Sequence, residues 1–212
     1  MNQETELRAS IVKWGRSIFE RGLTSGSSGN ISVRLDDRFL MTPTNSCLGF
    51  LEADKMSLLD SNGTLLSGDK PTKELPLHFA FYRSRPAAKA VVHLHSTYAT
   101  ALSCLEDVDC NDAIPAITPY VVMRVGNVPV LPYTKPGAKD AEPMIFAKAA
   151  DHAAILLGNH GPVVAGRSLE DAVFIMEELE EAAKLIMITR GMNVRLLNQT
   201  HVNELNRAYP LK

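Results

Sequence analysis

The sequence contains little cysteine and no pattern that pairs it. Its three cysteines, Cys47, Cys104 and Cys110, are odd in number and lack CxxC spacing. This usage argues against the disulfide framework of a small secreted domain. We therefore expect reduced thiols that serve as small packing residues.

The chain also lacks a large excess of charge of either sign and any long apolar run. It has 22 basic and 24 acidic residues without a block of like charge, so neither a nucleic-acid surface nor a membrane surface is predicted. No apolar run approaches the roughly 18 residues needed to span a bilayer. Residues 1–8 are polar and acidic, unlike a secretory signal, and we expect a cytoplasmic protein. A small anionic ligand would then have to find positive charge locally.

The overall composition is that of an ordinary soluble protein. The 212 residues are 45% hydrophobic and 22% charged, and no repeat or low-complexity linker divides them. This length fits one sizeable hydrophobic core better than two. We expect residues 1–212 to form a single domain.

Local patterns predict helices interspersed with short strands. Helical spacing of apolar residues and capping signals predict helices over residues 4–21, about 71–82, after 96, 139–150 and 168–191. Short or alternating apolar segments predict strands over 31–35, 39–41, 56–59, 64–66, 90–95, 130–131, 154–157 and 163–165. Because tight turns join several neighbouring strands, we predict an α/β fold. It is a three-layer domain with a largely antiparallel central sheet flanked by helices.

The most informative motif is a pair of histidines at the end of an apolar run. In a strand, alternate side chains share one face, so His93 and His95 could chelate a single ion. His160 could complete a set of three nitrogens. Three protein ligands with an open fourth position are typical of catalytic zinc. The pair alone is equally compatible with two partly exposed polar residues at a strand end.

Three other segments have features suited to an anion, although each alone is also typical of an ordinary turn. Ser28-Gly29-Asn30 has a backbone able to take positive φ, which lets amide groups converge on an anion. Residues 41–46 place hydroxyls and an amide beside a proline. Residues 70–74 add two lysines before a predicted helix, whose N-terminus favours phosphate. Glu74 could be catalytic or could merely complement the helix dipole.

Taken in order, these motifs resemble the class II aldolases, a family that includes L-fuculose-phosphate aldolase and L-ribulose-phosphate 4-epimerase. The motifs that carry the resemblance are Ser28-Gly29-Asn30-Ile31-Ser32, Thr42-Pro43-Thr44, Pro71-Thr72-Lys73-Glu74, His93-x-His95 and Asn159-His160-Gly161. Their order and rough spacing hold from residue 7 to about residue 190.

The resemblance implies a site and an assembly. His93, His95 and His160 would ligate Zn²⁺. Glu74 would act as acid/base and would also ligate the metal when substrate is absent. Tyr120 would reach into a neighbouring subunit's site and assist as an acid, in a homotetramer with interfacial active sites. The implied substrate and phosphate contacts are Ser28, Gly29, Asn30, Thr44, Asn45, Thr72 and Lys73.

Two departures from the aldolases touch the substrate pocket. Asn45 stands where the aldolases carry glycine, and Thr72-Lys73 stands where they carry Ser-Ser. The strings 41–49, 67–71 and 93–97 resemble instead one branch of the family, the 3-oxo-tetronate 4-phosphate decarboxylases. The resemblance implies that a 3-keto acid loses carbon dioxide to leave the enediolate of dihydroxyacetone phosphate. Glu74 would then deliver a proton to carbon 2.

Several alternatives stay open at this level. An aldolase that cleaves a ketose 1-phosphate to dihydroxyacetone phosphate and an aldehyde would use the same metal site. A non-catalytic, adducin-like domain is disfavoured because the three histidines and Glu74 are all present. Imidazole ligands suit zinc but also copper, iron and nickel. The configuration at carbon 2 of the substrate, D or L, is undetermined.

Two further expectations concern single residues. We place Lys73 near the phosphate, because tight pairing with the substrate carboxylate would stabilise the ground state and oppose decarboxylation. His78, His152 and His201 have no partner at ligand spacing, and we expect them on helix faces or at the surface.

Overall fold

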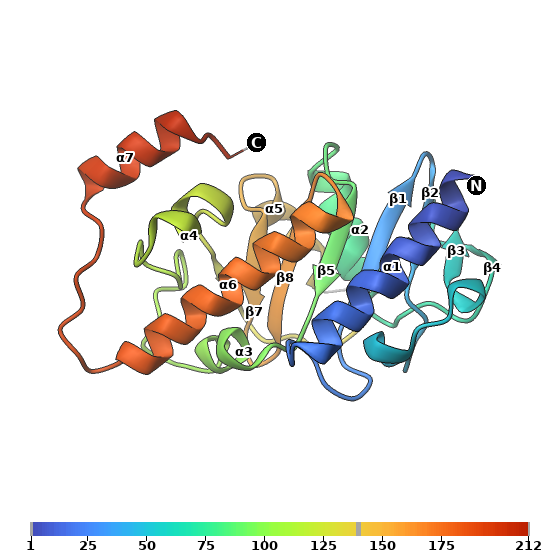
Figure 1. Cartoon of the computed structure of the whole chain (residues 1–212), viewed down its shortest axis with the longest axis horizontal. Helices are drawn as coiled ribbons and strands as arrows, with labels where there is room; N and C mark the ends of the chain where they lie inside the picture. The colour runs from blue at the N-terminus through green and yellow to red at the C-terminus, as the bar shows by residue number, and fades with distance from the viewer. Residues whose placement is uncertain (1, 139–140, 212) are drawn as a thin grey trace.

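Eight strands form one sheet in the computed structural model, which describes residues 2–138 and 141–211 (Figure 1). The order across the sheet is β4-β3-β2-β1-β5-β8-β7-β6. The strands are β1 (Asn30–Leu35), β2 (Arg38–Met41), β3 (Ser57–Leu59), β4 (Leu65–Ser67), β5 (Ala90–His93), β6 (Val130–Leu131), β7 (Ala154–Leu157) and β8 (Gly161–Gly166). Neighbouring strands are antiparallel except β6 and β7, which are parallel. This confirms the predicted α/β fold with a largely antiparallel sheet.

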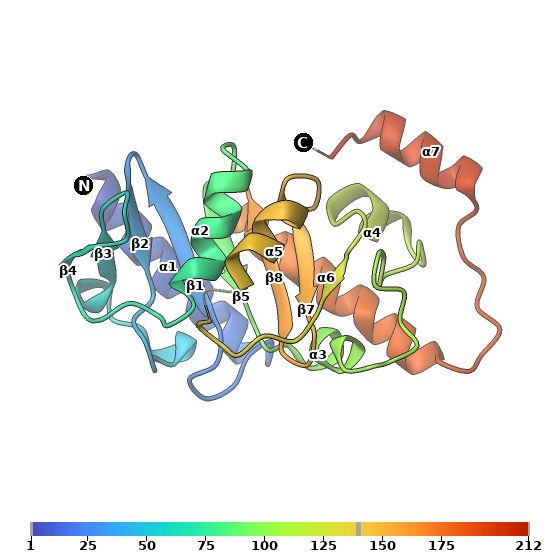
Figure 2. The same cartoon turned by 180° about the vertical axis from the view of Figure 1, so that it is seen from behind.

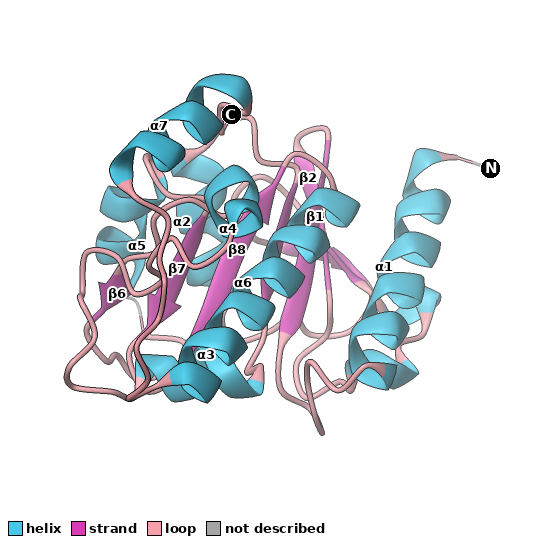
Figure 3. Cartoon of the chain, turned by 60° about the vertical axis from the view of Figure 1, so that its left-hand side comes forward, coloured by secondary structure: helices cyan, strands magenta, loops and turns pink. Residues whose placement is uncertain are grey.

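Helices cover both faces of the sheet, which gives the three layers seen in Figure 3. The helices are α1 (Gln3–Glu20), α2 (Leu75–Ser84), α3 (Thr97–Ser103), α4 (Pro119–Arg124), α5 (Ala141–Ala149), α6 (Leu169–Thr189) and α7 (Gln199–Ala208), with short 3-10 helices η1 (Leu48–Phe50) and η2 (Ala53–Lys55). Helices α1, α3 and α6 lie on the face seen in Figure 1, and α2 and α5 lie on the face seen in Figure 2.

Alternation along the central strands divides the core between these two layers. In β5, Ala90 and Val92 belong to the core cluster under α1 and α6, whereas Val91 belongs to the cluster under α2 and α5. All three side chains are fully buried. A strand covered on both faces reads as a continuous apolar run, which is why the run before His93 carries no alternation in its sequence.

Two predicted boundaries are wrong, and both concern the site. Strand β5 ends at His93, so His95 lies beyond the strand. Helix α2 begins at Leu75, because Pro71 forms an isolated bridge with Pro43 and holds the preceding backbone extended. Ser96 is the N-cap of α3 by position, but its side chain makes no capping hydrogen bond.

Two helices were not predicted at all. Helix α4 has only six residues, and α7 has no buried residue. The predicted helix at 139–150 corresponds to α5, but its predicted first two residues lie outside the described ones. Within residues 2–138 and 141–211, no helix has both the length and the apolar character required to cross a membrane.

Candidate active site

The sheet register brings three distant parts of the chain to one edge. Asn30, the first residue of β1, pairs with His93, the last residue of β5, and His93 in turn pairs with Val163 of β8. His160 lies in the turn between β7 and β8, next to Gly161. Antiparallel pairing therefore places the start of β1, the end of β5 and this turn beside one another.

Glu74 joins the three histidines at this edge in one tight group. Its Oε2 lies 3.3 Å from His93 Nε2, and its Oε1 lies 3.2 Å from His160 Nε2. The Nε2 atoms of His93 and His95 are 3.2 Å apart. One ligand atom from each of the four residues lies within 4.8 Å of every other. Although His95 lies outside the strand, the structure places the four predicted metal-site residues together.

The donor set fits a divalent cation. Nδ1 of His93 lies 2.8 Å from the carbonyl oxygen of Pro162 and donates to it, which leaves the lone pair of Nε2 facing the other ligands. Zinc bonds of about 2.0 to 2.2 Å in a tetrahedron separate neighbouring ligand atoms by about 3.3 to 3.5 Å. The separations of 3.2 to 3.3 Å between atoms in the cluster are close to that range. His95 is exposed, so the cluster is open to a ligand from solvent.

The electrostatics of the group also suit a cation. Burial alone would raise the pKa of Glu74, but neighbouring His93 and hydrogen bonds with His160 and Asn30 together lower it well below its usual range. Burial lowers the pKa of His93 to about 4, and Glu74 offsets this only in part. Burial also lowers the pKa of His95. At neutral pH these groups are an ionised carboxylate and two neutral imidazoles, the protonation states that metal binding requires.

The three segments predicted to bind an anion are hydrogen-bonded to one another beside this cluster. The backbone of Ile31 exchanges hydrogen bonds with Thr42, donating to its Oγ1 and accepting from its amide. The amide of Thr44 donates to the carbonyl oxygen of Lys70 at 2.9 Å. The loops that contain residues 28–30, 42–46 and 70–74 therefore form one continuous rim.

The predicted phosphate-binding residues differ in how accessible they are. Gly29 has a φ of 84°, as the segment predicts, and a Cβ there would lie 3.1 Å from the carbonyl oxygen of His93. Asn45 is exposed with a φ of 58°, and Lys73 is also exposed. Thr44 is half-buried, while Thr72 is almost buried and its hydroxyl accepts from the amide of Glu74.

Ser28 and Asn30 already have partners within the chain. The Ser28 hydroxyl donates to the carbonyl oxygen of Ser25. Asn30 is buried, and its Nδ2 donates to Glu74 Oε2 at 2.8 Å. Because the hydroxyl proton of Ser28 is already donated, the backbone of Gly29 is the part of this first segment best suited to an anion.

Residues 9–187 match the family described as Class II Aldolase and Adducin N-terminal domain. The chain belongs to this family.

Individual members of the class II aldolase family differ in how similar they are to this chain. The chain is 51% identical over 207 residues to the 3-oxo-tetronate 4-phosphate decarboxylase of Pectobacterium atrosepticum, covering 97% of this chain and 95% of that protein. The crystal structure of YgbL from Escherichia coli superposes with a TM-score of 0.94 at 49% identity, covering 96% and 99% of the two chains. The L-fuculose phosphate aldolase of Methanocaldococcus jannaschii is 36% identical, covering 84% of this chain and 94% of that one.

Within a single chain, Tyr120 does not lie with the cluster of Glu74 and the three histidines. It lies in α4, which packs against α6 and α7, and 56% of its surface is exposed. Figure 1 shows α4 above α3, toward the other end of the strands. An exposed tyrosine in this position is free to contact another molecule.

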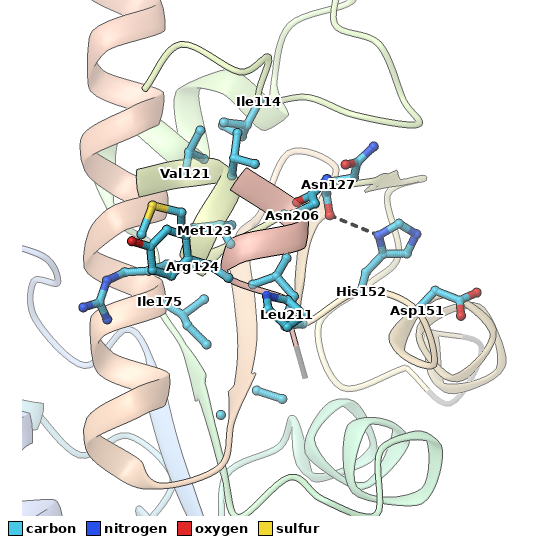
Figure 4. Close-up of a pocket in the computed structure, with 18 of the residues that line it drawn as sticks. Ile114, Val121, Met123, Arg124, Asn127, Asp151, His152, Ile175, Asn206 and Leu211 are labelled. Atoms are coloured by element: carbon cyan, nitrogen blue, oxygen red, sulfur yellow. Dashed lines mark hydrogen bonds between the residues drawn. The ribbon is translucent and has the colours of Figure 1, made fainter. Parts of the chain in front are cut away.

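A cavity also lies elsewhere in the protein. It measures about 980 Å³ and is lined mainly by α4, the C-terminal segment and the loop around His152 (Figure 4). None of the four cluster residues lines it. His152, in the wall, donates from Nδ1 to the carbonyl oxygen of Asn127 at 3.0 Å. The four clustered residues at the sheet edge are therefore separate from this cavity.

Sequence reasoning missed one buried histidine of the site. His78 is fully buried in α2 and contacts Asn30 and Ser32. The sequence signal available was its position four residues after Glu74, which places both on one side of a helical turn.

Proposed function

We propose that this protein is a metal-dependent decarboxylase that converts 3-oxo-tetronate 4-phosphate to dihydroxyacetone phosphate and carbon dioxide. The observation that carries the proposal is the group of His93, His95, His160 and Glu74 beside three linked anion-suited loops. We choose this substrate because the relative at 51% identity is a 3-oxo-tetronate 4-phosphate decarboxylase. The aldolase alternative is weaker, because the aldolase relative is only 36% identical to this chain.

His93, His95 and His160 hold the metal, with Glu74 as a fourth ligand when no substrate is bound. Zinc is our choice because imidazole and carboxylate donors suit it. Bound there, the divalent ion supplies positive charge that stabilises the enediolate left when carbon dioxide departs. His93 contributes a fixed ring, since the bond to Pro162 sets its tautomer.

Glu74 is the acid/base group of the proposed reaction. Because it is ionised at neutral pH, it accepts a proton from the substrate's 2-hydroxyl or from solvent before it delivers one to carbon 2. Breaking the bond between carbons 1 and 2 releases carbon dioxide, and the new C–H bond forms at carbon 2. One solvent proton is consumed overall.

The loop rim binds the 4-phosphate in this proposal. Gly29 offers its backbone, Thr44, Asn45 and Thr72 offer polar side chains, and exposed Lys73 supplies the positive charge. Ser28 and Asn30 flank Gly29 in the same segment, and Asn30 donates a hydrogen bond to Glu74. Tyr120 of one subunit assists at the site of its neighbour in a homotetramer, which accounts for its exposure in the single chain.

A product assay tests the reaction. We expect the zinc-loaded protein to release carbon dioxide and to form dihydroxyacetone phosphate from 3-oxo-tetronate 4-phosphate, offered separately in its D- and L-forms. Cleavage of a ketose 1-phosphate to an aldehyde, without carbon dioxide from either form, would replace the decarboxylase with the aldolase. A His95→Ala variant serves as the control for metal content, because it removes one ligand at an exposed position.

A further inference from the structure

A buried row of hydrogen-bonded side chains runs from Glu74 into the protein, between β1 and α2. Asn30 Nδ2 donates to Glu74 Oε2 at 2.8 Å, and Asn30 Oδ1 contacts His78 Nε2. His78 Nδ1 lies 2.7 Å from Ser32 Oγ. Ser32 Oγ lies 2.8 Å from Tyr82 Oη, the last member of the row.

The periods of strand and helix explain why these residues meet. Asn30 and Ser32 alternate along β1 and so share the face turned toward α2. Glu74 is the N-cap of α2, and His78 and Tyr82 follow it within the helix at intervals of four residues, so the three lie along one side. The two rows interleave across the interface, where Asn30, Ser32 and His78 are 5%, 0% and 0% exposed.

The ionised carboxylate fixes the direction of every hydrogen bond in the row. A carboxylate can only accept, so the NH2 group of Asn30 must face Glu74 and its Oδ1 must face His78. His78 must then donate from Nε2. Its Nδ1 consequently accepts from Ser32, whose oxygen accepts in turn from Tyr82.

The charge state of His78 agrees with this direction. Burial, together with nearby His93, lowers the pKa of His78 to about 3, so the ring is neutral at neutral pH. A neutral imidazole with its proton on Nε2 has one donor and one acceptor. Both are used within the row.

We propose that His78 is a positioning residue, which holds the Asn30 amide with its NH2 group toward Glu74 and thereby orients that carboxylate for proton transfer. The proposal rests on the acid/base role of Glu74 in the proposed function. If the amide of Asn30 turned over, its oxygen would face the carboxylate oxygen and repel it. His78 prevents this because its Nε2–H has no other acceptor in the row.

Two replacements of His78 separate positioning from packing. His78→Gln retains an N–H donor near the position of Nε2, whereas His78→Leu fills the space without a donor. Mutation of a residue that hydrogen-bonds to a metal ligand typically lowers metal affinity or activity by about 10- to 100-fold. We expect His78→Leu to lower kcat by about that factor, with KM and zinc content close to wild type, and His78→Gln to restore most of the loss. His152→Leu, which removes a hydrogen-bonded histidine in the distant cavity wall, should leave kcat unchanged.

Equal kcat losses in the Gln and Leu variants, or wild-type kcat in both, would overturn the proposal. Nitrogen-15 NMR of the histidine rings gives a test on the wild-type protein that requires no variant to fold. We expect His78 to carry its proton on Nε2 and none on Nδ1, and a proton on Nδ1 would contradict the assigned direction.

The same experiments distinguish this proposal from the proposed function. A wild-type protein that releases no carbon dioxide overturns the reaction, whereas the position of the His78 proton decides the hydrogen-bond row. Ser32→Ala provides a milder change at the far side of the ring. It should shift the Nδ1 resonance of His78, and an unchanged resonance would count against the row.

Discussion

Replacing Glu180 would test whether helix α6 holds the histidine pair in place from across the core. The carboxylate of Glu180 accepts from the amides of Tyr98 and Ala99, each at 2.8 Å, and the side chain is only 7% exposed. These amides belong to the first turn of α3, which starts two residues after His95. Because Ser96 makes no capping bond, Glu180 serves as the cap of this helix.

The contacts set the expected magnitude. Hydrogen bonds to charged groups contribute about 1.5 to 3 kcal/mol each, and water entering a truncated site restores part of that. We expect Glu180→Ala to lower the free energy of unfolding by about 2 to 4 kcal/mol. Glu180→Gln keeps one acceptor oxygen and should lose roughly half as much. Metal affinity should fall as well, because the backbone after His95 is less firmly held.

Urea unfolding of the metal-free protein, followed by circular dichroism, measures this loss, and zinc titration measures the affinity. The matched control is Glu181→Ala, one residue along the same helix, where the side chain is exposed and 3.6 Å from Lys184. Exposed pairs of this kind contribute at most about 1 kcal/mol. A Glu180→Ala variant no less stable than the Glu181→Ala variant would refute the capping role.

Three further predictions concern the site itself. Glu74→Gln should lower kcat by about 10²- to 10⁴-fold. Circular dichroism should show that the variant retains its fold. Turnover at the wild-type rate would show that Glu74 does not transfer the proton. Burial lowers the pKa of His93 to about 4 and that of His78 to about 3, below the usual 6.5. As the pH falls, the unfolded chain therefore binds protons at these two histidines before the folded chain does. The free energy of unfolding of the metal-free protein should fall below about pH 6.5, by up to about 3 kcal/mol per pH unit. Above that pH the two histidines should not affect the stability. Urea midpoints between pH 5 and 8 check this, and a flat profile would contradict it. Gly29→Ala, at a φ of 84°, should cost about 1 to 3 kcal/mol of stability and raise KM, measured by steady-state kinetics; an unchanged KM would exclude the Gly29 backbone from substrate binding.

Features written in local sequence were predicted correctly. The hairpin with Asn62 and Gly63 at its tip forms, with Gly63 at a φ of 85°, because the turn chemistry is contained in two residues. The long helix α6 starts where the Ser168 hydroxyl accepts from the amide of Asp171, a cap visible in the sequence. The four candidate ligands also lie together, as the family resemblance implies and local sequence alone does not.

Features that depend on partners far away in the sequence could not be predicted from local sequence patterns. His78 looks like an isolated helix residue because its partners Asn30 and Ser32 are 48 and 46 positions away. Glu180 caps a helix that lies 81 to 82 positions earlier in the chain. Strand β5 ends at His93, the last residue in register with both β1 and β8, and the apolar run does not reveal where this pairing stops. In each case the deciding contact comes from the tertiary fold.

Decarboxylation in heavy water is the most direct test of the proposed reaction, because it reports on both the bond that breaks and the face of carbon 2 that is protonated. If the zinc-loaded protein removes carbon dioxide from 3-oxo-tetronate 4-phosphate and Glu74 protonates carbon 2 from its fixed position, the dihydroxyacetone phosphate will carry one deuterium at that carbon in a single configuration, which NMR shows after the product is converted to a chiral derivative. Product deuterated in both configurations equally, or no dihydroxyacetone phosphate at all, would contradict the account.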